Sequence, residues 1–126
     1  MIKHTELIER AEILSKQSSE IEWRDSIKHS YYYFYHELNQ FLSKHKIDLM
    51  DKSYGEHQFA IEKLKSIENR SAKTLARYVQ ILKDKRVISC YKLDASVSQF
   101  QARQQLKECQ NAIIKLKELD TLLQEK

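Results

Sequence analysis

The chain contains no proline and only one glycine in 126 residues, and this scarcity restricts the folds open to it. A sheet protein of this size needs several tight turns, and such turns depend on glycine and proline. Long helices joined by short polar connections need neither residue. Hydrophobic residues make up 41% of the chain and charged residues 32%, a mixture typical of folded domains. We therefore predict a single all-α domain over residues 1–126, an up-and-down bundle of four to five helices.

The strongest helical pattern lies in Ser19–Lys44. Apolar residues recur there at spacings of three and four, which places them on one helical face: Trp23, Ile27, Tyr31, Phe34, Leu38, Phe41 and Leu42. Four of the five residues from Tyr31 to Tyr35 are tyrosine. We expect this cluster to be core or dimer interface, with stacking on nucleic-acid bases as the alternative.

Capping residues and polar breaks predict the remaining boundaries. In chain order these are an N-cap at Thr5, a connection over residues 46–55 with a Ser53–Glu56 capping box, a break at Asn69–Ser71, a linker over residues 89–97, and a Ser98–Gln101 capping box that opens the last helix.

Positive charge is concentrated in the second half of the chain. Residues 1–60 carry 8 Lys/Arg and 10 Asp/Glu, whereas residues 61–126 carry 14 and 8. Lys63, Arg70, Lys73 and Arg77 would form one basic stripe if the helices on either side of Asn69 were continuous. Such a stripe suits RNA phosphates or an acidic protein partner, and a solvated helix face is the alternative.

Several kinds of chemistry are absent from the sequence. Cys90 and Cys109 lack the short spacing of a zinc or redox motif, and one glycine cannot build a phosphate-binding loop. We predict no metal site and no small-molecule cofactor. No apolar run approaches the roughly 20 residues that span a bilayer, and none resembles a signal peptide, so we expect a cytoplasmic protein without membrane contact.

The segment from Arg24 to Leu42 resembles the corresponding helix of the HEPN superfamily, which reads roughly Ala-x-x-Arg-x-Tyr-Tyr-Ala-x-Phe-His. The residues in comparable places are Ser26, Tyr31, Tyr32, Tyr35 and His36, while His29 stands where the family usually has arginine. Three later stretches are also similar to the family: Tyr54–Phe59, Leu82–Tyr91 and Val97–Ala102. The resemblance covers about residues 19–117.

This resemblance implies a helical bundle that commonly dimerises and is often encoded in toxin–antitoxin or phage-defence systems. Active members of the family are metal-independent ribonucleases that use an Arg-x4-6-His motif, in which arginine holds phosphate and histidine transfers a proton. By the same resemblance Arg86 takes the arginine position, but Tyr91 stands where histidine is expected. A tyrosine titrates near pH 10 and a histidine near 6.5, so this exchange predicts degenerate catalysis.

If the chain does cleave RNA, we expect Arg86 to hold the phosphate and His57 or His36 to replace the missing histidine. Arg24 and His29 have Arg-x4-His spacing, but they lie about 140° apart around a helix, which does not suit joint work on one phosphate. We interpret that pair as solvated positions with a coincidental spacing.

Two classes of function follow from the sequence. The first is a HEPN-like homodimer that binds RNA or a cognate toxin or antitoxin protein. The alternative is a small helical immunity or antitoxin protein that occludes a toxin and needs no catalytic residue. A purely structural dimer module inside a larger complex is a third option.

Overall fold

The computed structural model describes residues 3–47 and 55–124, and these residues form five helices and no strand. The helices are α1 (Thr5–Ser15), α2 (Glu20–Lys44), α3 (Glu56–Lys65), α4 (Arg70–Tyr91) and α5 (Gln99–Gln124). The predicted all-α bundle of four to five helices is therefore confirmed.

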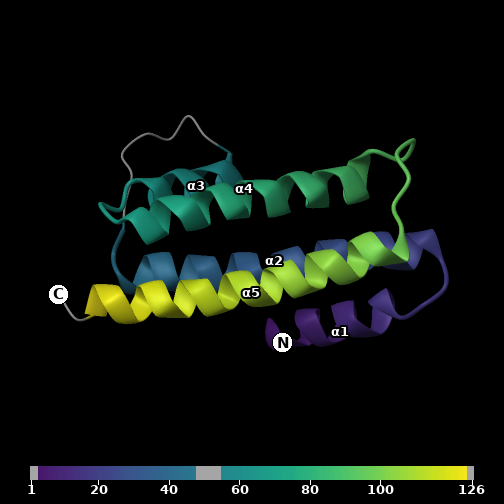
Figure 1. Cartoon of the computed structure of the whole chain (residues 1–126), viewed down its shortest axis with the longest axis horizontal. Coiled ribbons are helices and arrows are strands. Elements are labelled where there is room, and N and C mark those ends of the chain that lie inside the picture. The colour runs from purple at the N-terminus through teal and green to yellow at the C-terminus, as the bar shows by residue number, and fades with distance from the viewer. Residues whose placement is uncertain (1–2, 48–54, 125–126) are drawn as a thin grey trace.

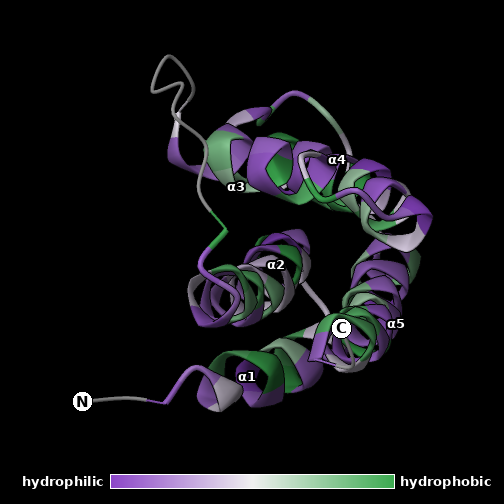
Figure 2. Ribbon diagram, turned by 90° about the vertical axis from the view of Figure 1, so that its left-hand side faces the viewer, coloured by the Kyte–Doolittle hydropathy of each residue, from purple (hydrophilic) through white to green (hydrophobic). Residues whose placement is uncertain are grey.

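Helix α2 lies at the centre of the bundle and contacts each of the other four helices. Figure 1 and Figure 2 show α2 and α5 side by side, with α3 and α4 covering them on one side and α1 on the other. The long helices alternate in direction along the order α1, α2, α4 and α5, as in an up-and-down bundle.

Helix α3 departs from this alternation. His57, near its start, contacts Tyr31 in the middle of α2, whereas Lys63, near its end, shares a surface hollow with Asn39 and Ser43. Helix α3 therefore runs in the same direction as α2. It then forms an antiparallel hairpin with α4, in which Gln58 accepts a hydrogen bond from Lys83.

The core is built around the predicted apolar face of α2. Tyr31, Phe34 and Leu38 are fully buried, and leucine, valine and cysteine side chains of the other long helices pack against them. Burial of each large apolar side chain contributes about 1.5–3 kcal/mol relative to exposure. This face therefore accounts for the central place of α2 in the bundle.

Two predicted helix starts are confirmed in detail. Ser98 and Gln101 form a reciprocal capping box, each backbone amide donating to the other side chain at 2.7 and 3.1 Å. The Asn69 side chain accepts hydrogen bonds from the amides of Ser71 and Ala72. Asn69 therefore caps the start of α4, directly after the turn that follows α3.

Other predicted boundaries are wrong or lie outside the described residues. The residue before α1 is His4, and Thr5 is already helical. The predicted linker over residues 89–97 starts too early, because α4 continues to Tyr91 and buries Ser89, whose hydroxyl donates to the carbonyl of Arg86. Ser53 and most of the 46–55 connection lie outside the described residues.

Candidate functional site

Arg86 lies in a cage of tyrosine rings between α4 and α2. Its side chain is only 6% exposed. The guanidinium carbon is 5.5 Å from the ring centroids of both Tyr31 and Tyr32 and 5.9 Å from that of Tyr91. All three distances are within the range of cation–π attraction. Two of these rings come from α2 and the third from the end of α4 itself.

The tyrosine spacing on α2 explains how the cage forms. Tyr31 and Tyr35 are one helical turn apart, and their rings stack with centroids 6.1 Å apart. Tyr32 meets both rings edge-on, at 5.7 Å from Tyr31 and 6.3 Å from Tyr35. Aromatic pairs favour these geometries, so the three rings pack as one cluster on α2, and Tyr31 and Tyr32 face Arg86.

His57 completes this cluster from the first turn of α3. Its ring centroid is 4.2 Å from that of Tyr35, and its Nδ1 atom is 3.0 Å from the hydroxyl of Tyr31. Burial lowers the pKa of His57 below its ordinary value, and the positive charge of Arg86 lowers it further. His57 is therefore neutral at pH 7.

The Tyr31 hydroxyl is the donor in its hydrogen bond with His57. Burial strongly raises the pKa of Tyr31, so the hydroxyl keeps its proton. Among the described residues the only hydrogen-bond partner of this hydroxyl is Nδ1 of His57. Because Tyr31 is fully buried, its hydroxyl hydrogen would lack an acceptor if Nδ1 were the donor; Nδ1 is therefore assigned as the acceptor, and the ring proton of neutral His57 as lying on Nε2.

The guanidinium of Arg86 is only partly satisfied. Among residues 3–47 and 55–124, its buried Nε atom has no hydrogen-bond partner and no carboxylate forms an ion pair with Arg86. A buried donor to which no acceptor is bound costs about 1–3 kcal/mol. An anion at this point would remove that cost, and the fork geometry of arginine suits a phosphate.

The four predicted catalytic candidates do not all come together. Arg86, Tyr91 and His57 belong to the cluster described above. His36 is exposed, and its ring lies 6.3 Å from that of His4, which forms a 2.6 Å contact with Glu37. Within the cluster, His57 meets the rings of Tyr31, Tyr32 and Tyr35, whereas His36 approaches only that of Tyr35, with centroids 6.1 Å apart.

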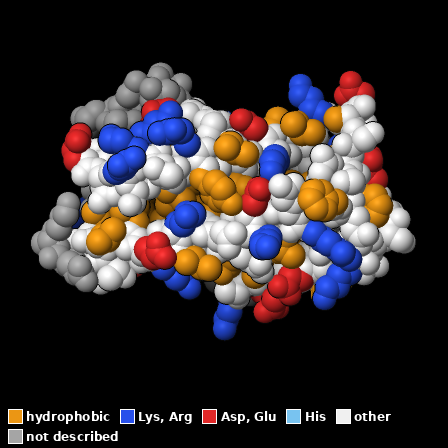
Figure 3. Space-filling model, viewed as in Figure 1, with side chains coloured by type: hydrophobic (Ala, Val, Ile, Leu, Met, Phe, Trp, Pro, Cys, Tyr) orange, Lys and Arg blue, Asp and Glu red, His pale blue; other side chains and the backbone are white. Residues whose placement is uncertain are grey.

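The predicted basic stripe is not continuous, because α3 and α4 form a hairpin and not one helix. Lys63 lies on α3, 4.7 Å from the ring of Phe59. Arg70, Lys73 and Arg77 are exposed along the first half of α4. Figure 3 shows basic side chains gathered over the end of the molecule where α3 meets α4. A positive surface is present, but it is formed by two antiparallel helices.

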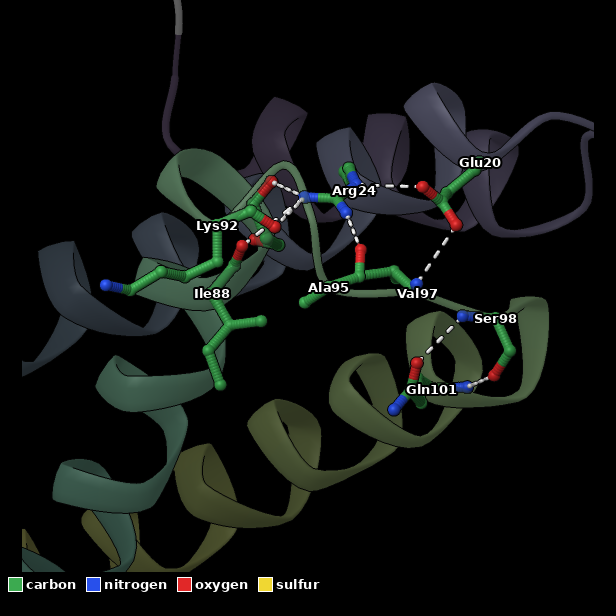
Figure 4. A network of polar contacts seen from close by, with 9 residues as sticks. Glu20, Arg24, Ile88, Lys92, Ala95, Val97, Ser98 and Gln101 are labelled. Carbon is green, nitrogen blue, oxygen red and sulfur yellow. Dashed lines mark hydrogen bonds and ion pairs between the residues drawn. The ribbon is translucent and has the colours of Figure 1, made fainter.

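The interpretation of Arg24 as a solvated residue is wrong. Arg24 is 8% exposed and donates to four backbone carbonyls at and just beyond the end of α4: those of Ile88, Ser89, Lys92 and Ala95. Figure 4 shows this network, in which Glu20 contacts Arg24 and accepts from the amide of Val97 at 3.1 Å. Its supposed partner His29 hydrogen-bonds to the carbonyl of Asp25 and takes no part in this network.

Arg24 therefore caps the C-terminus of a helix more than 60 residues away in sequence. The last carbonyls of a helix lack intrahelical partners and carry partial negative charge, so a buried arginine both satisfies and neutralises them. This role was missed because no local spacing reveals a contact between distant segments. The network fixes the end of α4, which carries Tyr91.

The described part of the chain contains no cluster of three or more metal-ligating side chains. None of its helices is long and apolar enough to cross a membrane. Comparison with known protein families, curated proteins and solved structures yields no match to this chain.

Proposed function

We propose that this chain is a HEPN-like protein of a bacterial or phage toxin–antitoxin or defence system, which binds RNA in the cytoplasm through the Arg86 cluster and has a degenerate ribonuclease site. The observation that carries the proposal is the buried Nε of Arg86, which has no hydrogen-bond partner in the described residues and lies among Tyr31, Tyr32 and Tyr91. The family resemblance assigns phosphate binding to this same arginine.

The distribution of basic residues supports RNA as the ligand over a small anionic molecule. Arg70, Lys73 and Arg77 extend positive charge along the helix that ends in the Arg86 cluster. These residues are exposed on the face of α4 opposite to buried Arg86, so only a long polyanion that crosses the helix can contact both regions. Phosphate contacts of this kind supply sequence-independent affinity that falls as salt concentration rises.

The state of His57 supports the proposal of degenerate catalysis. A general base needs a free ring nitrogen to accept a proton, but Nδ1 of His57 accepts from Tyr31 and Nε2 carries the ring proton. His57 can donate a hydrogen bond to a phosphate oxygen in this state. It cannot take a proton from a ribose hydroxyl without breaking its bond to Tyr31.

The proposal is tested by fluorescence anisotropy with a labelled single-stranded RNA of mixed sequence at low salt. Wild-type protein is expected to bind, and Arg86→Gln is expected to bind at least tenfold more weakly. Arg103→Gln is the matched control, because Arg103 is exposed on α5 and its replacement removes the same charge. Arg86→Lys keeps the charge without the guanidinium fork and should lie between wild type and Arg86→Gln.

Circular dichroism of each variant distinguishes lost binding from lost folding. If Arg86→Gln unfolds, the RNA binding of Arg86→Lys is compared with that of Arg103→Gln instead. Equal binding by the Arg86 and Arg103 variants contradicts the proposal. Absence of RNA binding by the wild type, together with a stable complex with a cognate toxin, favours the immunity alternative. Incubation with total RNA should leave the RNA intact.

A further inference from the structure

Tyr91 differs from the other tyrosines of the cage in its exposure. Tyr31 is fully buried and Tyr32 is partly buried, but Tyr91 is 68% exposed at the last residue of α4. Its ring nevertheless remains 5.9 Å from the guanidinium carbon of Arg86. The ring thus lies between a buried cation and solvent.

This position leaves much of the ring open to a ligand. Because Tyr91 as a residue is 68% exposed, the described protein leaves much of its side chain uncovered. Aromatic side chains open to solvent beside positive charge are the elements from which single-strand binding sites are built, because every base has a π-face that stacks on them. Duplex bases are already stacked and do not present that face.

Phe100 provides an internal comparison. It is 72% exposed, about as much as Tyr91, but no cation–π or aromatic contact of Phe100 occurs in the described residues. Exposure alone therefore does not distinguish Tyr91. The buried arginine behind the Tyr91 ring does distinguish it. In a nucleotide the base and its phosphate are joined through a single sugar, so one nucleotide can contact the ring and the arginine together.

We propose that Tyr91 is a stacking platform for one unpaired base of single-stranded RNA, whose adjoining phosphate is bound by Arg86. This inference rests on the RNA-binding function proposed above and adds its substrate class. Tyr91 then occupies the position of the family's histidine as a binding residue and not as a proton donor. The Arg24 network holds the end of α4, and so the backbone of Tyr91, in place.

The test compares Tyr91→Ala, Tyr91→Phe and the control Phe100→Ala for binding to one labelled single-stranded RNA. Loss of one stacked base is expected to weaken binding by Tyr91→Ala roughly 5- to 150-fold. Tyr91→Phe keeps the ring and should bind like wild type, as should Phe100→Ala. Both residues are exposed, so thermal unfolding of all three variants should match that of the wild type.

Two further ligands test the stacking step itself. A duplex of the same sequence should bind the wild type more weakly than the single strand, and Tyr91→Ala should remove most of this preference. A strand of the same length with abasic sites should bind wild type and Tyr91→Ala alike.

The outcomes separate this inference from the function on which it rests. If wild-type protein binds no RNA, both are overturned. If binding depends on Arg86 but Tyr91→Ala binds as well as wild type, only the stacking platform is overturned. A wild-type protein that binds the abasic strand as tightly as the intact strand overturns it as well.

Discussion

The hydroxyl of Tyr31, on α2, donates a hydrogen bond to Nδ1 of His57, on α3, over 3.0 Å. This bond joins the fully buried centre of the core to a histidine at the edge of the Arg86 cluster. It fixes both the orientation of the His57 ring and the nitrogen that carries its proton. The chemistry available to His57 therefore depends on a core residue.

Tyr31→Phe should destabilise the protein by about 1–2 kcal/mol, because it removes the donor and leaves a partly buried acceptor on His57. It should also raise the pKa of His57, because the hydrogen bond to Nδ1 stabilises the neutral ring and the substitution removes this bond. Urea unfolding measures the first effect and an NMR titration of His57 measures the second. Tyr78→Phe is the control, as Tyr78 is partly buried and makes no hydroxyl hydrogen bond to the described residues. An unchanged His57 pKa in Tyr31→Phe would contradict the assigned donor.

The stability of the protein should fall as pH is lowered from about 7 to 5. The folded-state pKa of His57 is below its ordinary value of 6.5, so the unfolded chain binds a proton more readily than the folded one. The contribution of His57 is therefore fully present above pH 6.5 and is lost on acidification through the folded-state pKa. Arg86 and Lys83 on α4 oppose protonation of His57, and Glu56 favours it.

His57→Gln tests this dependence because it removes the titrating group and keeps a polar side chain. Denaturant unfolding at pH 7.5 and pH 5.5 should show a smaller loss of stability in the variant than in the wild type. His29→Gln is the control, since it also replaces one histidine with glutamine, and among the described residues His29 hydrogen-bonds to the backbone carbonyl of Asp25 and not to the Arg86 cluster. Equal pH dependence in wild type and His57→Gln would assign the effect to other groups.

Arg24→Ala should destabilise the protein by about 3 kcal/mol, because it leaves several carbonyls at the end of α4 without their buried donor. Arg10→Ala removes an exposed arginine from α1 and should change the free energy of unfolding by less than about 0.5 kcal/mol. Hydrogen exchange gives a local readout: the amide of Val97, which donates to Glu20, should exchange faster in Arg24→Ala. Similar effects of the two substitutions would show that the Arg24 network contributes little.

The helices could be predicted from the sequence because their signals are local. The apolar face of α2, the Asn69 break and the Ser98–Gln101 box each depend on residues a few positions apart. The direction of α3 could not be predicted, since it depends on where a connection places the chain and not on periodicity. For the same reason the basic residues on α3 and α4 were expected to form one stripe.

Three of the four predicted catalytic candidates lie in the Arg86 cluster, but the geometry of this cluster was not predicted. Arg86, Tyr91 and His57 were named from the family resemblance, and their proximity follows only from the packing of α2, α3 and α4. The role of Tyr31 was not predicted, because a buried tyrosine on an apolar stripe resembles any other core residue. Arg24 was misinterpreted because its acceptors are backbone atoms, which leave no trace in a sequence.

The basic first half of α4 should set the salt dependence of RNA binding. Replacing both Arg70 and Arg77 with glutamine should weaken binding at low salt and reduce the slope of log affinity against log salt by about one to two.

The matched control replaces Arg103 and Lys107 with glutamine, because these residues are exposed on α5 and carry the same charge. Both double variants lower the net charge from +4 to +2, so a general charge effect would change both slopes equally. A larger change in the Arg70/Arg77 variant, with the preference for single-stranded RNA retained, would show that these residues contact phosphates while the Arg86 cluster selects the unpaired strand.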